Sequence, residues 1–246
     1  MDQFGGESCP ELVVELVQIG RLSEARLDQS IQRLLRLKFL LGLFDNPFVD
    51  ETRVPQVFGH PASVAAGVAS QKRAMTLLKN DEHTLPLQGR PRIFVKNVDP
   101  SIAARYAVVV STPKDADFAI LRLATPWVPV ETKNPIARSF HHGDLDFKEE
   151  AKAEILSLLQ TVPTIVVLYL DRPAVIPEIR AMAKALLAEY GASDVAMLDV
   201  LFGKASPEGR LPFELPSSME AVRKQKADVP YDSENPLYHF GFGMSY

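Results

Sequence analysis

Short apolar runs of strand length alternate with helical stretches over residues 85–216, and this alternation restricts the fold more than any other feature. The runs of strand length are Arg92–Val98, Ala107–Ser111, Phe118–Leu123 and Thr164–Leu170. The helical stretches are Lys148–Leu159, part of Ala174–Ala188, and Asp194–Leu201. All the strand runs but the first are almost continuously apolar, as is typical of parallel strands that helices cover on both faces. The sequence therefore predicts an α/β fold with a doubly wound, mostly parallel sheet flanked by helices.

The segments on either side of this region have other patterns. Apolar side chains recur at helical spacing over residues 11–45, and Asp45-Asn46-Pro47 ends that pattern. Residues 46–60 contain Pro47, Pro55 and Gly59 and are expected to be extended, and a second helix is expected over Ser63–Leu78. The predicted division is a helical part over 1–45, a linker and junction helix over 46–84, the α/β domain over 85–216, and an irregular segment over 217–246 that packs on it.

Composition excludes several classes of function. The net charge of −4 comes from interspersed charges, and the chain has no basic stripe for nucleic acid. The single cysteine, Cys9, excludes an internal disulfide and a cysteine-based metal site. No run approaches the ~20 apolar residues of a membrane span. Met1–Pro10 does not resemble a signal peptide, so a complete product of this sequence is expected to be cytoplasmic.

Four blocks of sequence carry a resemblance to a known family. They are Arg33–Asp45, Ala74–Asn80 with Leu85-Pro86-Leu87, Asp199–Gly203 with Pro207–Pro212, and Leu237–Tyr246. In this order they resemble the helix that closes the barrel of family 3 glycoside hydrolases, then the "LLKN…LPL" junction, the "DVLFG…P.GRLP" block and the "Y.FGYGLSY" closing motif of that family. Each block also has a structural interpretation: Gly203 and Gly209 suit a helix end and a turn, and the glycines of the final block allow close backbone approach.

The resemblance implies the C-terminal α/β sandwich of a β-glucosidase-like enzyme, preceded by a helical remnant of a (β/α)8 barrel. Family 3 enzymes remove β-linked sugars from non-reducing ends with retention, and they use two carboxyl groups about 5 Å apart. In that family the nucleophile is a barrel aspartate in an "SDW"-type motif. The only Ser-Asp pair here is Ser193-Asp194, within a helix-forming stretch, so no residue of this chain is expected to be the nucleophile.

The family's second domain supplies the acid/base carboxyl group from a loop, which the resemblance places in residues 124–146. Glu131 is the candidate acid/base, although the family's "GEHPY"-like sequence is replaced here by Ala124–Glu131, and a solvated loop charge is the alternative. Trp127 is a candidate aromatic platform for sugar, with core packing as its alternative. Asp144 is a lesser candidate for contact with substrate, and Asp146 is a candidate cap of the following helix.

Other polar residues of the loops have structural interpretations. His141-His142 lacks a third residue at metal-ligand spacing, so neither a metal nor a cofactor is expected. Asp171 and Arg172 are expected to form an ion pair that fixes the turn after a strand. No glycine-rich loop follows Arg92–Val98, which disfavours nucleotide binding.

Two functions remain open on the sequence. The first is the C-terminal part of a retaining exo-β-glycosidase, inactive alone, that acts on β-linked oligosaccharides or aryl glycosides with a separate barrel domain. The second is a non-catalytic module that binds carbohydrate or forms a homo-oligomer. The residues that would select the sugar lie chiefly on the barrel.

Overall fold

The computed structural model describes residue 2 and residues 8–246, and the chain divides into two compact units, Met1–His60 and Pro61–Tyr246. The first unit contains helices α1 (Pro10–Gln18), α2 (Glu24–Leu40) and α3 (Val54–Val57), with a short 3-10 turn, η1, at Glu51–Arg53. Ser23 caps α2, because its side chain accepts a hydrogen bond from the backbone N–H of Arg26. The segment expected to be extended, 46–60, thus includes short helical turns.

The first unit has little core of its own. Helices α1 and α2, both described in full, contain no buried residue. Large apolar side chains are instead exposed, among them Phe39 at 65%, Leu40 at 72% and Phe48 at 83%. Burial of such side chains stabilises a protein by about 1.5–3 kcal/mol each, so their exposure leaves this unit with weak internal packing.

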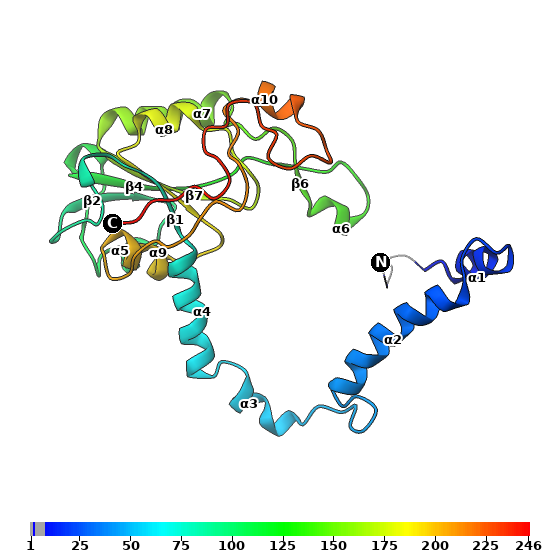
Figure 1. Cartoon of the computed structure of the whole chain (residues 1–246). Coiled ribbons are helices and arrows are strands. Elements are labelled where there is room, and N and C mark those ends of the chain that lie inside the picture. Colours follow the sequence, from blue (N-terminus) through cyan, green and yellow to red (C-terminus); the bar gives the residue numbers. More distant parts are fainter. Residues whose placement is uncertain (1, 3–7) are drawn as a thin grey trace. The chain divides into compact units, whose positions relative to one another are not determined.

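The second unit is built on a six-stranded sheet with the order β1-β8-β7-β4-β2-β3 (Figure 1). The strands are β1 (Thr76–Asn80), β2 (Arg92–Lys96), β3 (Val108–Val109), β4 (Phe118–Ala124), β7 (Thr164–Tyr169) and β8 (Ala185–Glu189). All neighbouring pairs are parallel except β1 and β8, which are antiparallel. The sheet is therefore mostly parallel, as the sequence predicts.

Helices cover both faces of this sheet (Figure 1). The helices of the second unit are α4 (Pro61–Ala74), α5 (Pro100–Ala103), α6 (Pro135–Arg138), α7 (Glu149–Thr161), α8 (Pro177–Met182), α9 (Asp194–Leu201) and α10 (Met219–Lys224), with 3-10 turns η2 (Asp81–His83) and η3 (Pro113–Asp115). Side chains alternate between two cores: Ile165 and Val167 of β7 pack with α5 and α9, whereas Val166 and Leu168 pack with α7 and α8. This two-sided burial explains why the strand is continuously apolar.

Two predicted helices were wrong in part, because each contains a strand. The helix expected over Ser63–Leu78 ends at Ala74, and Thr76 begins the edge strand β1. Ala185–Glu189, partly assigned to a helix, forms the inner strand β8, in which every residue is buried. A short apolar run gives no periodicity that separates a buried strand from a buried helix, and tertiary pairing decides between them.

A buried ionic cluster joins α4 to α9. The Nζ atom of Lys72 lies 2.5 Å from Oδ2 of Asp199, and the hydroxyl of Tyr106 donates a hydrogen bond of 2.7 Å to Oδ1 of Asp199. Burial raises the pKa of Asp199, but the hydrogen bonds from Lys72 and Tyr106 outweigh it, so this pKa lies below the ordinary 3.8. Burial and the hydrogen bond to Asp199 raise the pKa of Tyr106 to about 12. The first residue of the "DVLFG" block is thus a structural anchor.

The C-terminal segment lies along the edge strand β1. The backbone N–H of Met244 donates to the carbonyl of Leu77 at 2.8 Å, and Leu211 N–H donates to the carbonyl of Phe242 at 2.9 Å. Glycines allow this close packing, because a Cβ atom on Gly209 would lie 2.1 Å from the carbonyl oxygen of Ala74, and one on Gly243 would lie 2.4 Å from that of Gly209. The closing motifs therefore cover an edge that would otherwise be open to pairing.

Candidate functional site

The carboxyl ends of the parallel strands form the edge at which an open α/β sheet binds ligands. From β2 the chain continues to β3 at one edge of the sheet. From β4 it continues to β7 and β8 on the other side, so the direction in which successive strands are added reverses between β2 and β4. Asn97 follows β2 with a positive φ of 59°, and its side-chain amide donates to the carbonyl of Arg122 on β4 at 2.9 Å. Beside this point lies a cavity of about 250 Å³ lined by Lys96, Asn97 and Ala124 together with residues of α7.

The long loop after β4 is a hairpin, not the wholly irregular segment that the sequence suggests. Strand β5 (Val128–Pro129) pairs antiparallel with β6 (His141–His142), and helix α6 (Pro135–Arg138) lies between them. Asn134 caps α6, because its side chain accepts from the backbone N–H of Ile136. Short paired strands limit the conformations of this loop and hold both its ends near β4.

Two neighbouring residues after β7 fasten this hairpin to the sheet. Asp171 contacts Nδ1 of His141 through its carboxylate, and Nη2 of Arg172 donates to the carbonyl of Gly143 at 2.5 Å. The prediction that Asp171 and Arg172 pair with each other was therefore wrong, because each of them contacts the hairpin instead. Gly143 has a φ of +90°, and a Cβ atom there would lie 2.7 Å from Cγ2 of Val128, so this position requires glycine.

Trp127 lies on the hairpin with one face of its ring covered. The ring centroids of Trp127 and His141 are 3.9 Å apart and their planes differ by 11°, so the two rings are stacked. The contact with Asp171 orients His141, and His141 in turn supports the indole. Trp127 is 44% exposed, so it is not a core residue and presents aromatic surface to solvent.

Glu131 lies two residues after the end of β5, in the connection that leads to α6. It is exposed, and it forms no hydrogen bond or ion pair with any residue that the structure describes. A carboxyl group without a partner is available to contact a ligand. The hairpin thus carries Trp127 and Glu131 on the same short segment at the carboxyl edge of the sheet.

Asp144 and Asp146 are paired with cations. Lys148 Nζ lies 2.8 Å from Oδ2 of Asp144, and Arg223 Nη2 lies 3.3 Å from its Oδ1. The hydrogen bond from Lys148 holds the pKa of Asp144 below its ordinary 3.8, so Asp144 is a hydrogen-bond acceptor and not a proton donor near neutral pH. Asp146 does not cap α7, because Lys148 is the N-cap residue, and Asp146 instead pairs with Lys148 at 2.7 Å.

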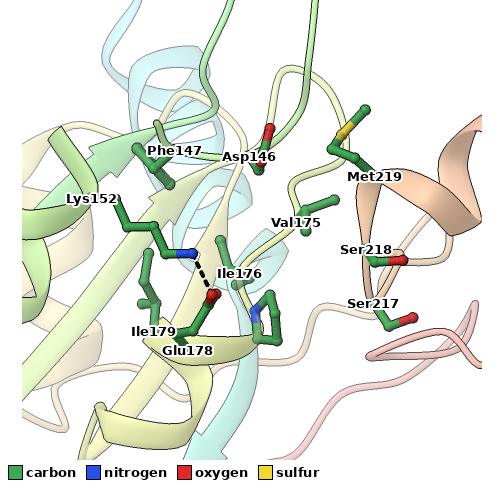
Figure 2. A pocket seen from close by; sticks show the side chains of 11 residues that line it. Asp146, Phe147, Lys152, Val175, Ile176, Glu178, Ile179, Ser217, Ser218 and Met219 are labelled. Atoms are coloured by element: carbon green, nitrogen blue, oxygen red, sulfur yellow. Dashed lines mark hydrogen bonds and ion pairs between the residues drawn. The ribbon is translucent and has the colours of Figure 1, made fainter. Parts of the chain in front are cut away.

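A cavity of about 190 Å³ lies between α7, α8 and the start of α10 (Figure 2). Its polar groups are mostly used by the fold: Lys152 pairs with Glu178, and Ser218 caps α10. The hydrogen bond from Lys152 lowers the pKa of Glu178. Since these groups bind one another, the cavity offers fewer free partners than the hairpin.

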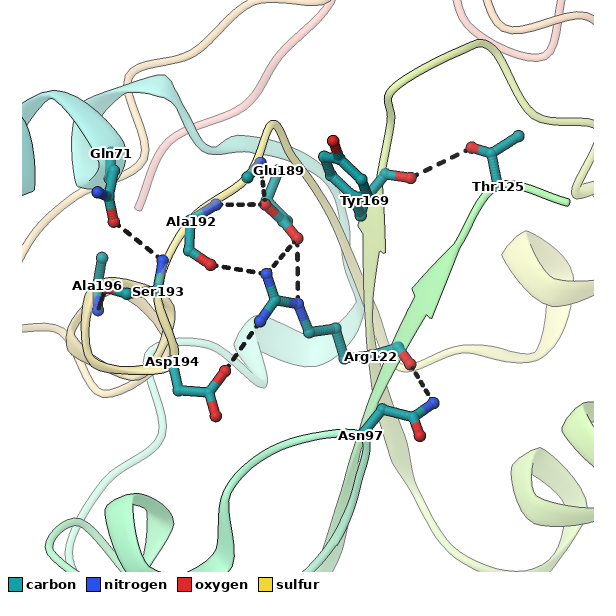
Figure 3. Close-up of polar contacts among 11 residues, drawn as sticks. Gln71, Asn97, Arg122, Thr125, Tyr169, Glu189, Ala192, Ser193, Asp194 and Ala196 are labelled. Carbon is teal, nitrogen blue, oxygen red and sulfur yellow. Dashed lines mark hydrogen bonds and ion pairs between the residues drawn. The ribbon is translucent and has the colours of Figure 1, made fainter. Parts of the chain in front are cut away.

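A second polar network, beneath the carboxyl edge, is structural (Figure 3). Arg122 of β4 donates to Oε1 of Glu189 at 2.6 Å and to Oδ1 of Asp194 at 2.8 Å. Glu189 is 0% exposed, and its Oε2 accepts the backbone N–H groups of Gly191 and Ala192 at 2.6 and 2.7 Å. Asp194 is thus held in an ion pair while Ser193 caps α9, which leaves neither as a nucleophile. The sequence analysis did not identify this network.

Neither a metal nor a membrane is indicated within the part of the chain that the structure describes. Across residue 2 and residues 8–246, no three His, Cys, Asp or Glu side chains are grouped as a metal site would require. No helix in those residues is both long enough and apolar enough to span a bilayer.

Comparison with known families decides the classification. Residues 97–246 match the family described as the glycosyl hydrolase family 3 C-terminal domain. This chain belongs to glycosyl hydrolase family 3. The match begins just after β2 and covers the hairpin and the last two of the four sequence blocks, so the resemblance to this family is confirmed.

Relatives of this family 3 chain include β-glucosidases. It is 46% identical over 250 residues to β-glucosidase C of Emericella nidulans, covering 100% of this chain and 40% of that protein. It is 37% identical over 247 residues to the periplasmic β-glucosidase/β-xylosidase of Dickeya chrysanthemi, covering 99% of this chain and 38% of that protein. The chain thus spans about two fifths of the length of these curated relatives.

Solved structures of β-glucosidases share the fold. A β-glucosidase of Listeria innocua, crystallised with glucose, superposes with a TM-score of 0.67 at 22% identity, over 95% of this chain and 40% of that one. A β-glucosidase of Erythrobacter marinus gives a TM-score of 0.71 at 19% identity, over 95% of this chain and 42% of that one. At such identities the likeness concerns the fold, and it confirms the predicted α/β class.

Proposed function

We propose that this chain is the C-terminal part of a retaining exo-acting β-glycosidase that hydrolyses β-glucosides, and that Glu131 is its acid/base. The observation that carries the proposal is the position of Glu131: an exposed, unpaired carboxyl group on a hairpin that Asp171 and Arg172 fasten at the carboxyl edge of the sheet. The names of the relatives support the reaction class. Their greater length supports a nucleophile outside these residues.

The reaction needs two carboxyl groups with different tasks. The nucleophile attacks the anomeric carbon while the protonated Glu131 gives its proton to the leaving oxygen, and the covalent glycosyl ester and the free alcohol result. In the second half, ionised Glu131 takes a proton from water as that water attacks the anomeric carbon, which releases the sugar and restores both carboxyl groups. In this scheme the hairpin must lie against a barrel that supplies the nucleophile.

The other residues of the hairpin have supporting roles in this proposal. Trp127 offers an aromatic face to the C–H groups of the sugar or aglycone on the leaving side of the scissile bond. Asp144, which Lys148 and Arg223 hold ionised, is suited to accept a hydrogen bond from a sugar hydroxyl. Neither group exchanges a proton during the reaction.

The experiment compares the purified chain alone with the same chain mixed with a barrel domain from the same genome. The substrates are 4-nitrophenyl β-glucoside and β-xyloside, and the readout is released nitrophenol. We expect no turnover from the chain alone and turnover from the mixture. Turnover by the chain alone would contradict the proposal that the nucleophile lies elsewhere, and two inactive tubes would favour a non-catalytic module.

The exposed apolar side chains of the first unit favour a second function, association with another protein. Phe39, Leu40 and Phe48 lie within a unit that buries little of its own surface. Contiguous exposed apolar side chains mark interaction surfaces. Sedimentation of the chain alone and with the barrel domain tests this: association with the barrel supports the split enzyme, and self-association only supports an oligomerisation module.

A further inference from the structure

We infer that the C-terminal segment forms a saccharide-binding pocket of its own, built around Tyr231 and Glu214. This pocket, which we call the Tyr231 pocket, has a volume of about 310 Å³ and is lined by residues of segments 213–216 and 225–232 together with Leu145 and Pro173. Such a volume is at the lower end of the range for small-molecule sites and suits one sugar ring. The inference does not depend on catalysis by Glu131.

The aromatic side of the pocket is Tyr231. Tyr231 is 54% exposed although its ring packs against Phe240, with ring centroids 4.5 Å apart and planes tilted by 34°. Tyr231 has a φ of +59°, a conformation that costs free energy for a residue with a Cβ atom and that tends to persist where it serves a function. An exposed ring with a partner on one side is suited to stack on the C–H face of a pyranose.

The polar side of the pocket is an unusual carboxylate. The side chain of Glu214 is only 9% exposed, yet among the described residues no Lys or Arg pairs with it, and the imidazole of His239 lies 3.5 Å away. Its Oε2 accepts the backbone N–H of Ser233 at 3.1 Å. A carboxylate offers about four acceptor positions, so Glu214 keeps capacity for the hydroxyl donors of a ligand. A buried carboxylate is stable only where such donors satisfy it.

The remaining polar groups complete this arrangement. Asp232 is held in place because its Oδ2 accepts the backbone N–H of Lys226 at 2.9 Å, and Gln225 adds an amide that can both donate and accept. Carboxylates and an amide facing an aromatic ring match a neutral ligand with many hydroxyl groups. The ligand class is therefore a neutral monosaccharide or one ring of an oligosaccharide.

The test is protein NMR of the purified 246-residue chain titrated with methyl β-D-glucopyranoside and with cellobiose, and with glycerol as the non-saccharide control. We expect saturable shifts of backbone amides in 213–216 and 225–232 with both sugars and none with glycerol. Tyr231→Asn tolerates a positive φ and removes the ring; it should weaken binding about tenfold. Glu214→Gln, which can still accept from Ser233, should weaken it as well.

Two matched variants separate this pocket from the hairpin. Trp127→Ala and Glu131→Gln should leave the affinity of the Tyr231 pocket unchanged, and Gln225→Ala, at an exposed position, should weaken it without altering the fold. The inference is overturned if no saturable shifts occur, if the shifts cluster on the hairpin, or if Tyr231→Asn and Gln225→Ala both bind as the parent chain does. Failure of the mixed activity assay would not affect any of these outcomes.

Discussion

His141 lies flat against Trp127, with ring centroids 3.9 Å apart and planes 11° from parallel, and the carboxylate of Asp171 contacts Nδ1 of the imidazole. This stack joins the hairpin to the end of β7. Since Trp127 is the only tryptophan, its fluorescence reports on the hairpin alone.

Loss of the His141 contact should loosen the hairpin. We expect His141→Ala to make Trp127 about twofold more accessible to acrylamide, since one face of the indole loses its cover. Asp171→Asn should have a smaller effect in the same direction, because the imidazole loses its orienting carboxylate but keeps its place. Stern–Volmer quenching measures both, and Asp228→Asn, at an exposed position, is the control. Unchanged quenching in His141→Ala would contradict the stacked arrangement.

Replacement of Arg122 should destabilise the second unit strongly. Arg122→Met leaves Glu189, which is 0% exposed, without its cation. Breaking a buried ion pair from one side costs about 3–5 kcal/mol, and this loss should appear as a lower urea midpoint. The double variant Arg122→Met/Glu189→Gln should recover part of that stability, because it removes the unpaired charge. Equal stability of the single and double variants would argue against the pairing.

Because of the Asp199 cluster, we expect the stability of the chain to depend on pH in the acidic range. The pKa of Asp199 in the folded chain is lower than its ordinary 3.8, so the unfolded state binds more protons in that range. The stabilisation by Asp199 is therefore full above about pH 4 and is lost as the pH falls through the folded pKa. We expect the free energy of unfolding at pH 7 to be higher for the parent chain than for the Asp199→Asn variant. This difference in free energy should narrow as the pH falls from 4 to 2.5. A gap independent of pH would contradict this account.

Gly209 and Gly67 form a matched pair of alanine substitutions. Gly209→Ala would place a Cβ atom 2.1 Å from the carbonyl oxygen of Ala74, whereas nothing lies within 4 Å of a Cβ atom on Gly67. We expect Gly209→Ala to lower the unfolding free energy by about 1–3 kcal/mol or more. Gly67→Ala, within α4, should raise it by up to about 1 kcal/mol, because alanine favours helix. Similar effects of both would show that the closing motifs do not pack closely on β1.

The sequence predicts strands best where burial is two-sided. β4 and β7 were predicted because their residues face a core on each side and are almost all apolar. β8 was missed because Ala185–Glu189 is short and equally compatible with a helix, and β1 because Thr76 follows α4 with hardly a break. Only pairing with distant strands distinguishes these cases.

The candidate site could be predicted in its place but not in its contacts. A proline-rich loop after a parallel strand, together with the family resemblance, pointed to Trp127 and Glu131 as candidates, and their roles stay predictions. The contacts that hold the site join residues far apart, with 30 positions between His141 and Asp171 and 67 between Arg122 and Glu189. No local pattern encodes such pairs, because the fold alone brings them together.

The role of Glu131 is tested most directly by the leaving-group dependence of Glu131→Gln in the mixed enzyme. Loss of the acid should lower kcat/KM about 10²- to 10⁴-fold for alkyl β-glucosides, whose leaving oxygen needs a proton. It should lower kcat/KM far less for 2,4-dinitrophenyl β-glucoside, whose leaving group departs as a stable anion, and Glu150→Gln should change neither. Equal losses for both substrates, or no loss for either, would contradict the assignment of Glu131 as the acid/base.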